Sequence, residues 1–344
     1  MNRKKELNGK HRPTWFFISL ALLLVLLLDL TFGSVSIPFS HFWKEIFSGE
    51  GLSYQERVIL TSFRIPRVIT ALLTGSALAV SGLQMQTIFR NPLAGPYVLG
   101  ISSGASLGAA IVVMGAGSAA AAFLSGMGII FAAWLGAAAM LLLLLLVSMK
   151  IRSVMTILIL GMMFGSGLSA IISIMQYFSA SSGLKAFVIW SMGSLSNVTA
   201  SDLKLFSWVI VPSLLLSLLS VKTLNGLMLG EEYARSMGVR LLRSRLIIFT
   251  LTSLLAGTVT AFCGPIGFVG VAVPHMARFL TGSSDHKILL PASLLLGMLV
   301  MTASDLLAQL PGSERILPIN AVTSLIGIPV VIWVVVRERK HIEQ

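Results

Sequence analysis

The sequence predicts an all-α, polytopic membrane protein with about ten transmembrane helices, and three observations support this fold class. Hydrophobic residues make up 56% of the 344 residues and charged residues only 11%, with a mean hydropathy of +0.91. Soluble domains carry about 25% charged residues, so lipid must cover most of this surface. The apolar residues also form long runs, and the basic residues gather in short clusters between them.

Ten apolar runs approach or exceed the length of about 20 residues that a bilayer requires. They cover residues 14–32, 64–89, 95–114, 119–149, 152–178, 203–222, 243–263, 266–282, 287–309 and 318–336. The run 266–282 is the weakest because it is rich in Gly and Pro. The run 119–149 holds no charge and is expected to tilt or to extend beyond the bilayer.

The N-terminus pairs a basic head with an apolar run and lacks a small-residue cleavage site, which predicts an uncleaved first span that starts in the cytoplasm. An even number of spans then places both termini inside, together with most of the 25 Lys and Arg residues. The expected organisation is a basic tail at 1–13, one transmembrane domain at 14–336 and a second tail at 337–344.

Three connections are longer than turns. Residues 33–63 are expected outside and contain the amphipathic "HFWKEIF", whereas residues 223–242 are expected inside. The outer segment 179–202 contains "LKAFVIWSMGSL", which is apolar but too short to span and indicates an interfacial or re-entrant helix.

Several function classes are disfavoured. A net charge of +12 would suit nucleic acid, but the basic clusters between apolar runs follow membrane topology instead, so no nucleic-acid partner is predicted. The one cysteine, Cys263, cannot form an intramolecular disulfide. Five scattered histidines show no ligand spacing, so neither a metal site nor a cofactor is expected.

Two stretches suggest an inverted repeat. "LLTGSALAVSG" (72–82) and "LLAGTVTAFCG" (254–264) match at several Leu, Gly and Ala positions with one constant offset, and each precedes a Gly- and Pro-rich stretch. The predicted spans run in opposite directions, as in transporters built from inverted repeats. Close helix packing alone could also select such small residues.

The stretches that follow the two copies are expected to break their helices. The first contains Asn91, Pro92 and Pro96, and the second contains Gly264, Pro265 and Gly267. Interrupted backbone must be satisfied inside protein or by water, so it belongs beside a cavity or a moving interface. A tightly packed static core is the alternative.

Four segments together resemble the permease subunits of type II ABC importers, the iron-siderophore, haem and cobalamin uptake family. They are "FRIPRVITALLTGSALAVSGLQMQTIFRNPLAGPYVLGISSGASLG" (63–108), "LGEEYARSMGV" (229–239), "GPIGFVGVAVPHMARFLTG" (264–282) and "LPINAVTSLIGIPVVIWVV" (317–335). The resemblance runs from about residue 60 to the end of the chain, in the order of the family. It implies an inverted-repeat, ten-helix subunit in the bacterial cytoplasmic membrane.

The resemblance also implies partners. The sequence has no G-x-x-x-x-G-K-[ST] motif, so ATP hydrolysis requires another polypeptide and this chain is not itself an enzyme. The family arrangement is two permease subunits (identical or close paralogues), two ATP-binding cassette subunits and an extracytoplasmic binding protein, with lipid around the permeases. The implied cargo is a ferric siderophore first, with cobalamin and haem as alternatives.

"LGEEYARSMGV", in the inside connection, is predicted to form a short helix. Glu231 and Arg235 are four residues apart and could pair on one face, and Gly238 could cap the end. The resemblance implies that this helix couples to the ATPase; the alternative is a solvated helix without a partner. The implied contact residues are Glu231, Ala234, Arg235, Ser236, Met237 and Gly238.

Arg64 and Arg67 begin the second span on the outside and share a helix face. Interfacial snorkelling would explain them, but the resemblance implies contacts with acidic residues of the binding protein. The family usually has a further arginine near the outer end of the ninth span. Gln309 stands at that place with Arg315 nearby, so Arg315 is the alternative third contact.

Four other polar residues have structural interpretations. Asp29, Asp305 and Glu314 could reach the outer interface as structural or docking residues, since no chain of carboxylates crosses the membrane as a proton relay would require. His275 is expected to pack and to anchor a helix end rather than to act as a pH switch.

The transport pathway is expected between two copies, beside the fifth and tenth spans. Candidate lining residues are Met155, Met162, Ser166, Ser169 and Gln176, although Met and Ser are also ordinary core residues. An ion-coupled secondary carrier remains the main alternative function. An intramembrane enzyme is a third, but no catalytic set stands at membrane depth.

Overall fold

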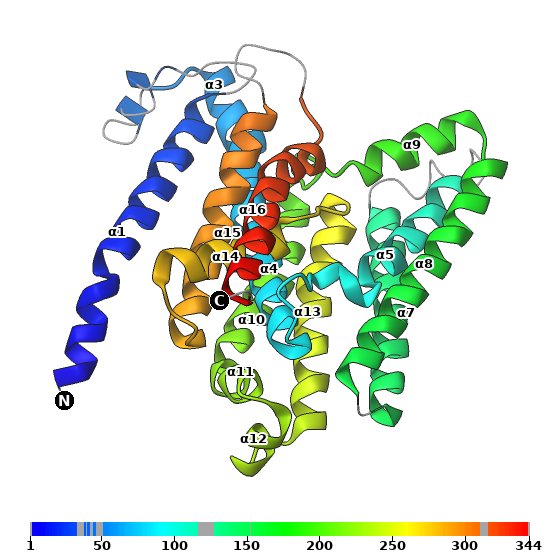
Figure 1. Ribbon diagram of the computed structural model, residues 1–344. Helices are drawn as coiled ribbons and strands as arrows, with labels where there is room; N and C mark the ends of the chain where they lie inside the picture. Colours follow the sequence, from blue (N-terminus) through cyan, green and yellow to red (C-terminus); the bar gives the residue numbers. More distant parts are fainter. Residues whose placement is uncertain are drawn as a thin grey trace.

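The computed structural model describes residues 2–32, 38, 40–41, 44–45, 51–115, 127–151, 153–309 and 316–342. All regular elements in these residues are helical (Figure 1). Seven described helices are long and apolar enough to cross a membrane, and two shorter apolar helices cover Ile101–Gly115 and Ile319–Trp333. The predicted all-α polytopic class is therefore confirmed.

The described residues form a series of helices and helical turns. In chain order they are α1 (Asn2–Thr31), α3 (Tyr54–Ile59), the π-helical turn η1 (Leu60–Arg64), α4 (Ile65–Phe89), the 3₁₀ turn η2 (Pro96–Leu99), α5 (Ile101–Ala110), the π-helical turn η3 (Ile111–Gly115), α7 (Met127–Lys150), α8 (Val154–Phe178), α9 (Ser181–Ser191), α10 (Ala200–Leu219), α11 (Val221–Met228), α12 (Glu231–Ser236), α13 (Leu241–Cys263), α14 (Val269–Thr281), α15 (His286–Ala308) and α16 (Ile319–Ile342).

Three predicted spans differ from the observed helices. The run 95–114 is divided between η2 and α5, because Gly100 adopts a left-handed conformation with φ of 73°. The run 266–282 becomes helical only at Val269, after an irregular segment. The run 64–89 begins earlier than predicted, because α3 and η1 extend it back to Tyr54. The first part of the run 119–149 and part of "HFWKEIF" lie outside the described residues.

Helix α4 lies at the centre of the bundle, and α13 runs antiparallel to it. Thr74 lies beside Cys263 at one end of the pair (Oγ1–Sγ, 3.7 Å), and the Thr252 hydroxyl donates to Gln84 Oε1 at the other (3.0 Å). Because the contacts proceed in opposite sequence directions, the two matching stretches form an inverted pair. Each helix leads into an irregular segment, at 90–95 and at 264–268.

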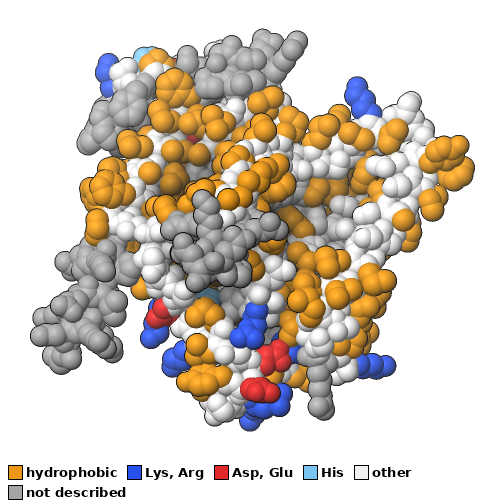
Figure 2. All heavy atoms as spheres, in the orientation of Figure 1, with side chains coloured by type: hydrophobic (Ala, Val, Ile, Leu, Met, Phe, Trp, Pro, Cys, Tyr) orange, Lys and Arg blue, Asp and Glu red, His pale blue; other side chains and the backbone are white. Residues whose placement is uncertain are grey.

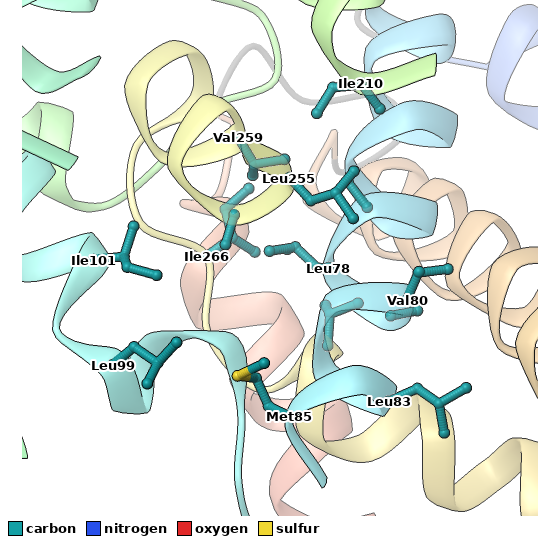
Figure 3. Close-up of a cluster of buried hydrophobic side chains, with 14 of the residues drawn as sticks. Leu78, Val80, Leu83, Met85, Leu99, Ile101, Ile210, Leu255, Val259 and Ile266 are labelled. Atoms are coloured by element: carbon teal, nitrogen blue, oxygen red, sulfur yellow. The ribbon is translucent and has the colours of Figure 1, made fainter. Parts of the chain in front are cut away.

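Small residues permit close crossings of the central helices. A Cβ atom at Gly75 would overlap the carbonyl of Gly297 on α15, and a Cβ atom at Gly82 would overlap the carbonyl of Gly270 on α14. Apolar side chains from α4, η2, α5, α10, α13 and the irregular segment 264–268 pack together in the core (Figure 3). The core therefore surrounds the interrupted helices.

The two ends of the bundle differ in composition. In Figure 1, α3 lies at the upper end, whereas α12 and the N-terminal end of α1 lie at the lower end. Figure 2 shows hydrophobic atoms over the middle of this face and most charged atoms along the lower edge. This distribution matches an apolar belt between a predicted outer end at α3 and a predicted inner end at α12.

Candidate functional site

The predicted outer end of the bundle, near α3 (Figure 1), holds a buried cluster of charged and amide side chains. Arg67 on α4 donates to both carboxylate oxygens of Asp305 on α15, at 2.7–3.0 Å. Gln309 Nε2 donates to Asp29 on α1 (2.8 Å) and to Asp305 (3.2 Å). Arg64 donates to the Leu30 carbonyl at 2.6 Å. These contacts join α1, α4 and α15 at one end.

This cluster assigns Asp29, Asp305 and Gln309 a structural position. Asp29 and Asp305 are each 1% exposed, so both carboxylates lie inside the protein. Asp305 is paired with Arg67, and such pairing makes a buried ionised carboxylate tolerable away from water. The Gln309 amide donates to both carboxylates, so this side chain holds them together through hydrogen bonds and without a charge of its own.

A depression of about 410 Å³ opens beside the cluster. Arg64, Arg67 and Gln309 line it together with Thr199 and residues of the π-helical turn. The π-helical turn ends at Arg64, which is only 7% exposed, and the Arg67 side chain is 14% exposed. The predicted docking arginines are thus in one place but largely enclosed. Arg315 and Glu314 lie outside the described residues.

The short helix α12 lies at the predicted inner end, opposite α3 (Figure 1). Ala234 is fully buried and anchors it, whereas Arg235, Ser236, Met237 and Gly238 are exposed. Gly238 has φ of 82°, and the N–H of Val239 donates to the Ala234 carbonyl at 3.0 Å. This is the glycine cap that the sequence predicted. Glu232 and Tyr233 add to the exposed face.

The predicted pair between Glu231 and Arg235 is wrong. The Glu231 carboxylate instead accepts a hydrogen bond from Arg245 on α13. Arg245 is 5% exposed and requires a counter-charge, whereas Arg235 on the surface is solvated. The contact fixes the beginning of α12 to α13. Glu231 and Ala234 therefore hold the helix in place, and the exposed residues form its free surface.

The irregular segments after α4 and α13 face each other. Tyr97 Oη accepts from the N–H of Ile266 at 3.2 Å, and His275 Nε2 binds the carbonyl of Pro92 at 2.7 Å. Pro96 packs against Gly270, where a Cβ atom would lie 2.6 Å from Pro96 Cδ. The predicted breaks therefore meet in the protein interior, where their free backbone groups find partners.

Other contacts complete the second break. Gly264 has φ of 75° and lies against the carbonyl of Trp190, while Pro265 continues the irregular segment. The N–H of Gly267 donates to Asn320 on α16 at 2.9 Å. Phe268, with φ of 65°, occupies the left-handed region although it is not a glycine. In the first break, Asn91 Oδ1 accepts from the N–H of Leu93 at 2.9 Å.

One face of α8 is open in the single chain. Met155, Met162, Ser166 and Ser169 are exposed, and Gln176 is half-buried. The hydroxyls of Ser166 and Ser169 donate to carbonyls of their own helix, at 3.0 and 2.9 Å. With these donors engaged, the face offers few strong ligands. Among the described residues, no group of three or more His, Cys, Asp and Glu could hold a metal ion.

Sequence reasoning missed the residues that connect the elements. Tyr97, Asn320, Asn225 and His286 each hydrogen-bond across distant parts of the chain. The available signal was their polarity in apolar surroundings, since a buried polar group requires a partner. That signal identifies a residue that needs a hydrogen-bond partner, but it does not identify the partner.

Comparison with known proteins agrees with this geometry. The chain matches the model of the FecCD transport family over residues 21–337. It is 37% identical over 336 residues to the vitamin B12 import system permease protein BtuC of Klebsiella pneumoniae subsp. pneumoniae, covering 97% of each chain. It is 34% identical over 340 residues to the hemin transport system permease protein HmuU of Yersinia pestis, covering 97% of this chain and 99% of the relative.

A solved structure of a metal-chelate type ABC transporter in an inward-facing conformation has the same fold. It superposes with a TM-score of 0.82 at 30% identity and covers 94% of this chain and 98% of its own. The all-helical, inverted-repeat architecture is therefore that of type II ABC importer permeases. With a family match over nearly its whole length, the chain belongs to the FecCD transport family.

Proposed function

We propose that this chain is the membrane permease subunit of an ATP-driven importer that carries a metal chelate into the cytoplasm by alternating access. The observation that carries the proposal is α12, a capped helix fixed by Glu231 to Arg245 with an exposed outer surface. A chain without a P-loop needs such a surface to receive force from an ATPase subunit.

Three partners complete the proposed assembly. Two ATP-binding cassette subunits would contact Arg235, Ser236, Met237 and Gly238 at the inner end. A second copy of this chain, or a close paralogue, would cover the open face of α8 and form the pathway with it. An extracytoplasmic binding protein would dock over the depression that contains Arg64 and Arg67. In this orientation both termini are cytoplasmic.

The proposed cargo class is a metal chelate. The relatives named for vitamin B12 and hemin, and the metal-chelate transporter of similar fold, support the class without selecting one member. Ferric siderophore, cobalamin and haem are the candidates. Binding of each to the partner binding protein, measured by calorimetry, would identify the cargo.

The test of the function is uptake into liposomes. The chain would be reconstituted with its ATPase subunits and binding protein, and the three candidate chelates would be offered with ATP supplied to the ATPase side. We expect uptake of one of them that stops when the ATPase lysine of the Walker motif is replaced. Uptake that continues without hydrolysis and follows a proton or sodium gradient would instead support the ion-coupled carrier.

A further inference from the structure

A buried histidine at the inner end connects three helices. His286 is the first residue of α15 and is 1% exposed. Its Nε2 lies 2.8 Å from the Thr87 hydroxyl on α4, and its Nδ1 lies 2.7 Å from Asn225 Oδ1 on α11. The His286 backbone N–H also donates to Asn225 Oδ1 at 2.9 Å. This ring therefore fills the junction between α4, α11 and α15.

The hydrogen-bond pattern determines the proton position on the ring. Asn225 Nδ2 donates to Asp285 Oδ1 at 2.7 Å, so its Oδ1 must face His286 as an acceptor. Burial raises the pKa of Asp285, but the hydrogen bonds from the Lys287 backbone N–H and from Asn225 lower it by more. The pKa of Asp285 is therefore below its ordinary value, and its carboxylate stays ionised as the acceptor for Asn225. His286 Nδ1 thus carries the proton, and Nε2 accepts the Thr87 hydroxyl. A neutral imidazole satisfies every partner.

A second contact joins the end of α4 to the residue before α12. Helix α4 ends at Arg90, which has a left-handed conformation, and its guanidinium packs over Gly230 directly before α12. Thr87 lies one turn before Arg90. The inner end of α4 therefore meets the segment 221–236 at two points, one of them through His286.

Helix α4 leads directly to the interrupted backbone. The break that begins at Asn91 follows its last turn, and Pro92 there binds His275 on α14. A displacement of α11 and α12 that moved the end of α4 would therefore move both breaks.

We propose that His286 is a positioning residue that holds α11 and α12 to the inner end of α4, so that movement of α12 displaces α4 and the breaks that follow it. The proposal rests on the proposed function, because it requires an ATPase that moves α12. His286 acts through Thr87 and Asn225 and touches no cargo.

The substitution His286→Phe removes the hydrogen bonds of the ring to Thr87 and Asn225 while keeping the fold. A phenyl ring fills similar space, the Thr87 hydroxyl can donate to the Leu83 carbonyl 2.8 Å away instead of to the ring, and Asn225 Oδ1 still accepts the backbone N–H of residue 286. No buried polar group is orphaned, so the variant is expected to fold. Thr87→Val removes the link from the other side, and Thr302→Val, whose hydroxyl bonds only within α15, is the matched control.

The experiment uses the full complex in lipid nanodiscs, with spin labels at exposed positions on Lys222→Cys in α11 and Leu93→Cys after α4. Electron–electron distances are measured without nucleotide and after trapping with ATP and vanadate. Stimulation of ATP hydrolysis by the binding protein is measured in parallel, because it needs no choice of cargo.

In the unsubstituted complex and in Thr302→Val, we expect the distance between the labels to be the same before and after trapping, since both segments move together. In His286→Phe and Thr87→Val the distance should broaden or shift on trapping, and stimulation should fall at least about five-fold, the lower end of typical coupling between sites. The double variant should fall no further than either single variant.

Two results would overturn the proposal alone: a label distance that changes on trapping in an active unsubstituted complex, or a His286→Phe complex with normal distances and normal stimulation. A different result, in which the unsubstituted chain assembles with no ATPase subunit, would overturn the proposed function and this inference with it. Size-exclusion chromatography of each complex separates these cases.

Discussion

Arg67 binds both carboxylate oxygens of Asp305 and so ties the N-terminal end of α4 to the C-terminal end of α15 across 238 residues of sequence. The Asp305 side chain is 1% exposed and that of Arg67 only 14%. A guanidinium and a carboxylate form two parallel hydrogen bonds in this geometry, which is the strongest form of such a pair. The proposed docking surface therefore contains an arginine whose charge is already balanced from within.

Arg67→Met is expected to destabilise the protein strongly. It leaves the buried carboxylate of Asp305 without its cation, which costs about 3–5 kcal/mol at such sites. The matched control is Arg57→Met, because Arg57 pairs with Glu45 at 2.8 Å but is 51% exposed and should contribute less than about 1 kcal/mol. Unfolding titrations with a denaturing detergent in mixed micelles compare the two.

A second substitution distinguishes lost pairing from lost packing. Arg67→Met combined with Asp305→Leu removes both charges and should recover a large part of the stability. If the double variant is as unstable as the sum of its parts, the pair does not account for the effect.

Much of the fold could be predicted because the chain uses a simple rule. A bilayer requires apolar runs of about 20 residues, so the positions of these runs locate most of the membrane-spanning helices. The breaks at Pro92 and Gly264 were also visible, because Pro and Gly interrupt hydrogen bonding wherever they stand. The inverted relation of α4 and α13 could be proposed from the matching stretches and needed only the antiparallel contacts for confirmation.

The pairings between elements could not be predicted in the same way. A spacing of four residues suggested Arg235 as the partner of Glu231, but the buried Arg245 has the greater need of a counter-charge. Local spacing describes neighbours on one helix, whereas burial depends on the packing of all of them. Similarly, the spacing of four residues allows Gln309 to contact Asp305, but nothing in the sequence indicated that Gln309 would also bind Asp29.

Glu231→Gln is expected to loosen α12. The amide lacks the charge that holds Arg245, so the beginning of this six-residue helix loses its fixed point. A spin label on Ser236 should become more mobile, as read from its continuous-wave spectrum. Glu232→Gln, at the exposed neighbouring position, should leave the spectrum unchanged. Equal spectra for the two variants would contradict an anchoring role for Glu231.

Gly82→Ala and Gly167→Ala should have opposite effects on stability. At Gly82 a methyl group would overlap the carbonyl of Gly270, so α4 and α14 must separate, at a cost of about 1–3 kcal/mol. Gly167 on α8 has no neighbouring atom within 4 Å of the added carbon. There the substitution should stabilise the helix by about 0.5–1 kcal/mol. The same detergent titration on the isolated chain measures both, and a shared sign would show that the crossing is not tightly packed.

Tyr97→Phe tests whether the two breaks support each other. The phenol oxygen is the partner of the Ile266 N–H, in the irregular segment before α14. Its removal leaves that N–H buried without an acceptor, which costs about 1–3 kcal/mol. Tyr177→Phe is the control, because Tyr177 on α8 is 83% exposed in the single chain. Hydrogen exchange read by mass spectrometry should show faster exchange at 264–268 in Tyr97→Phe alone. Unchanged exchange there would mean that the second break is held by Asn320 and its own backbone, without help from the first.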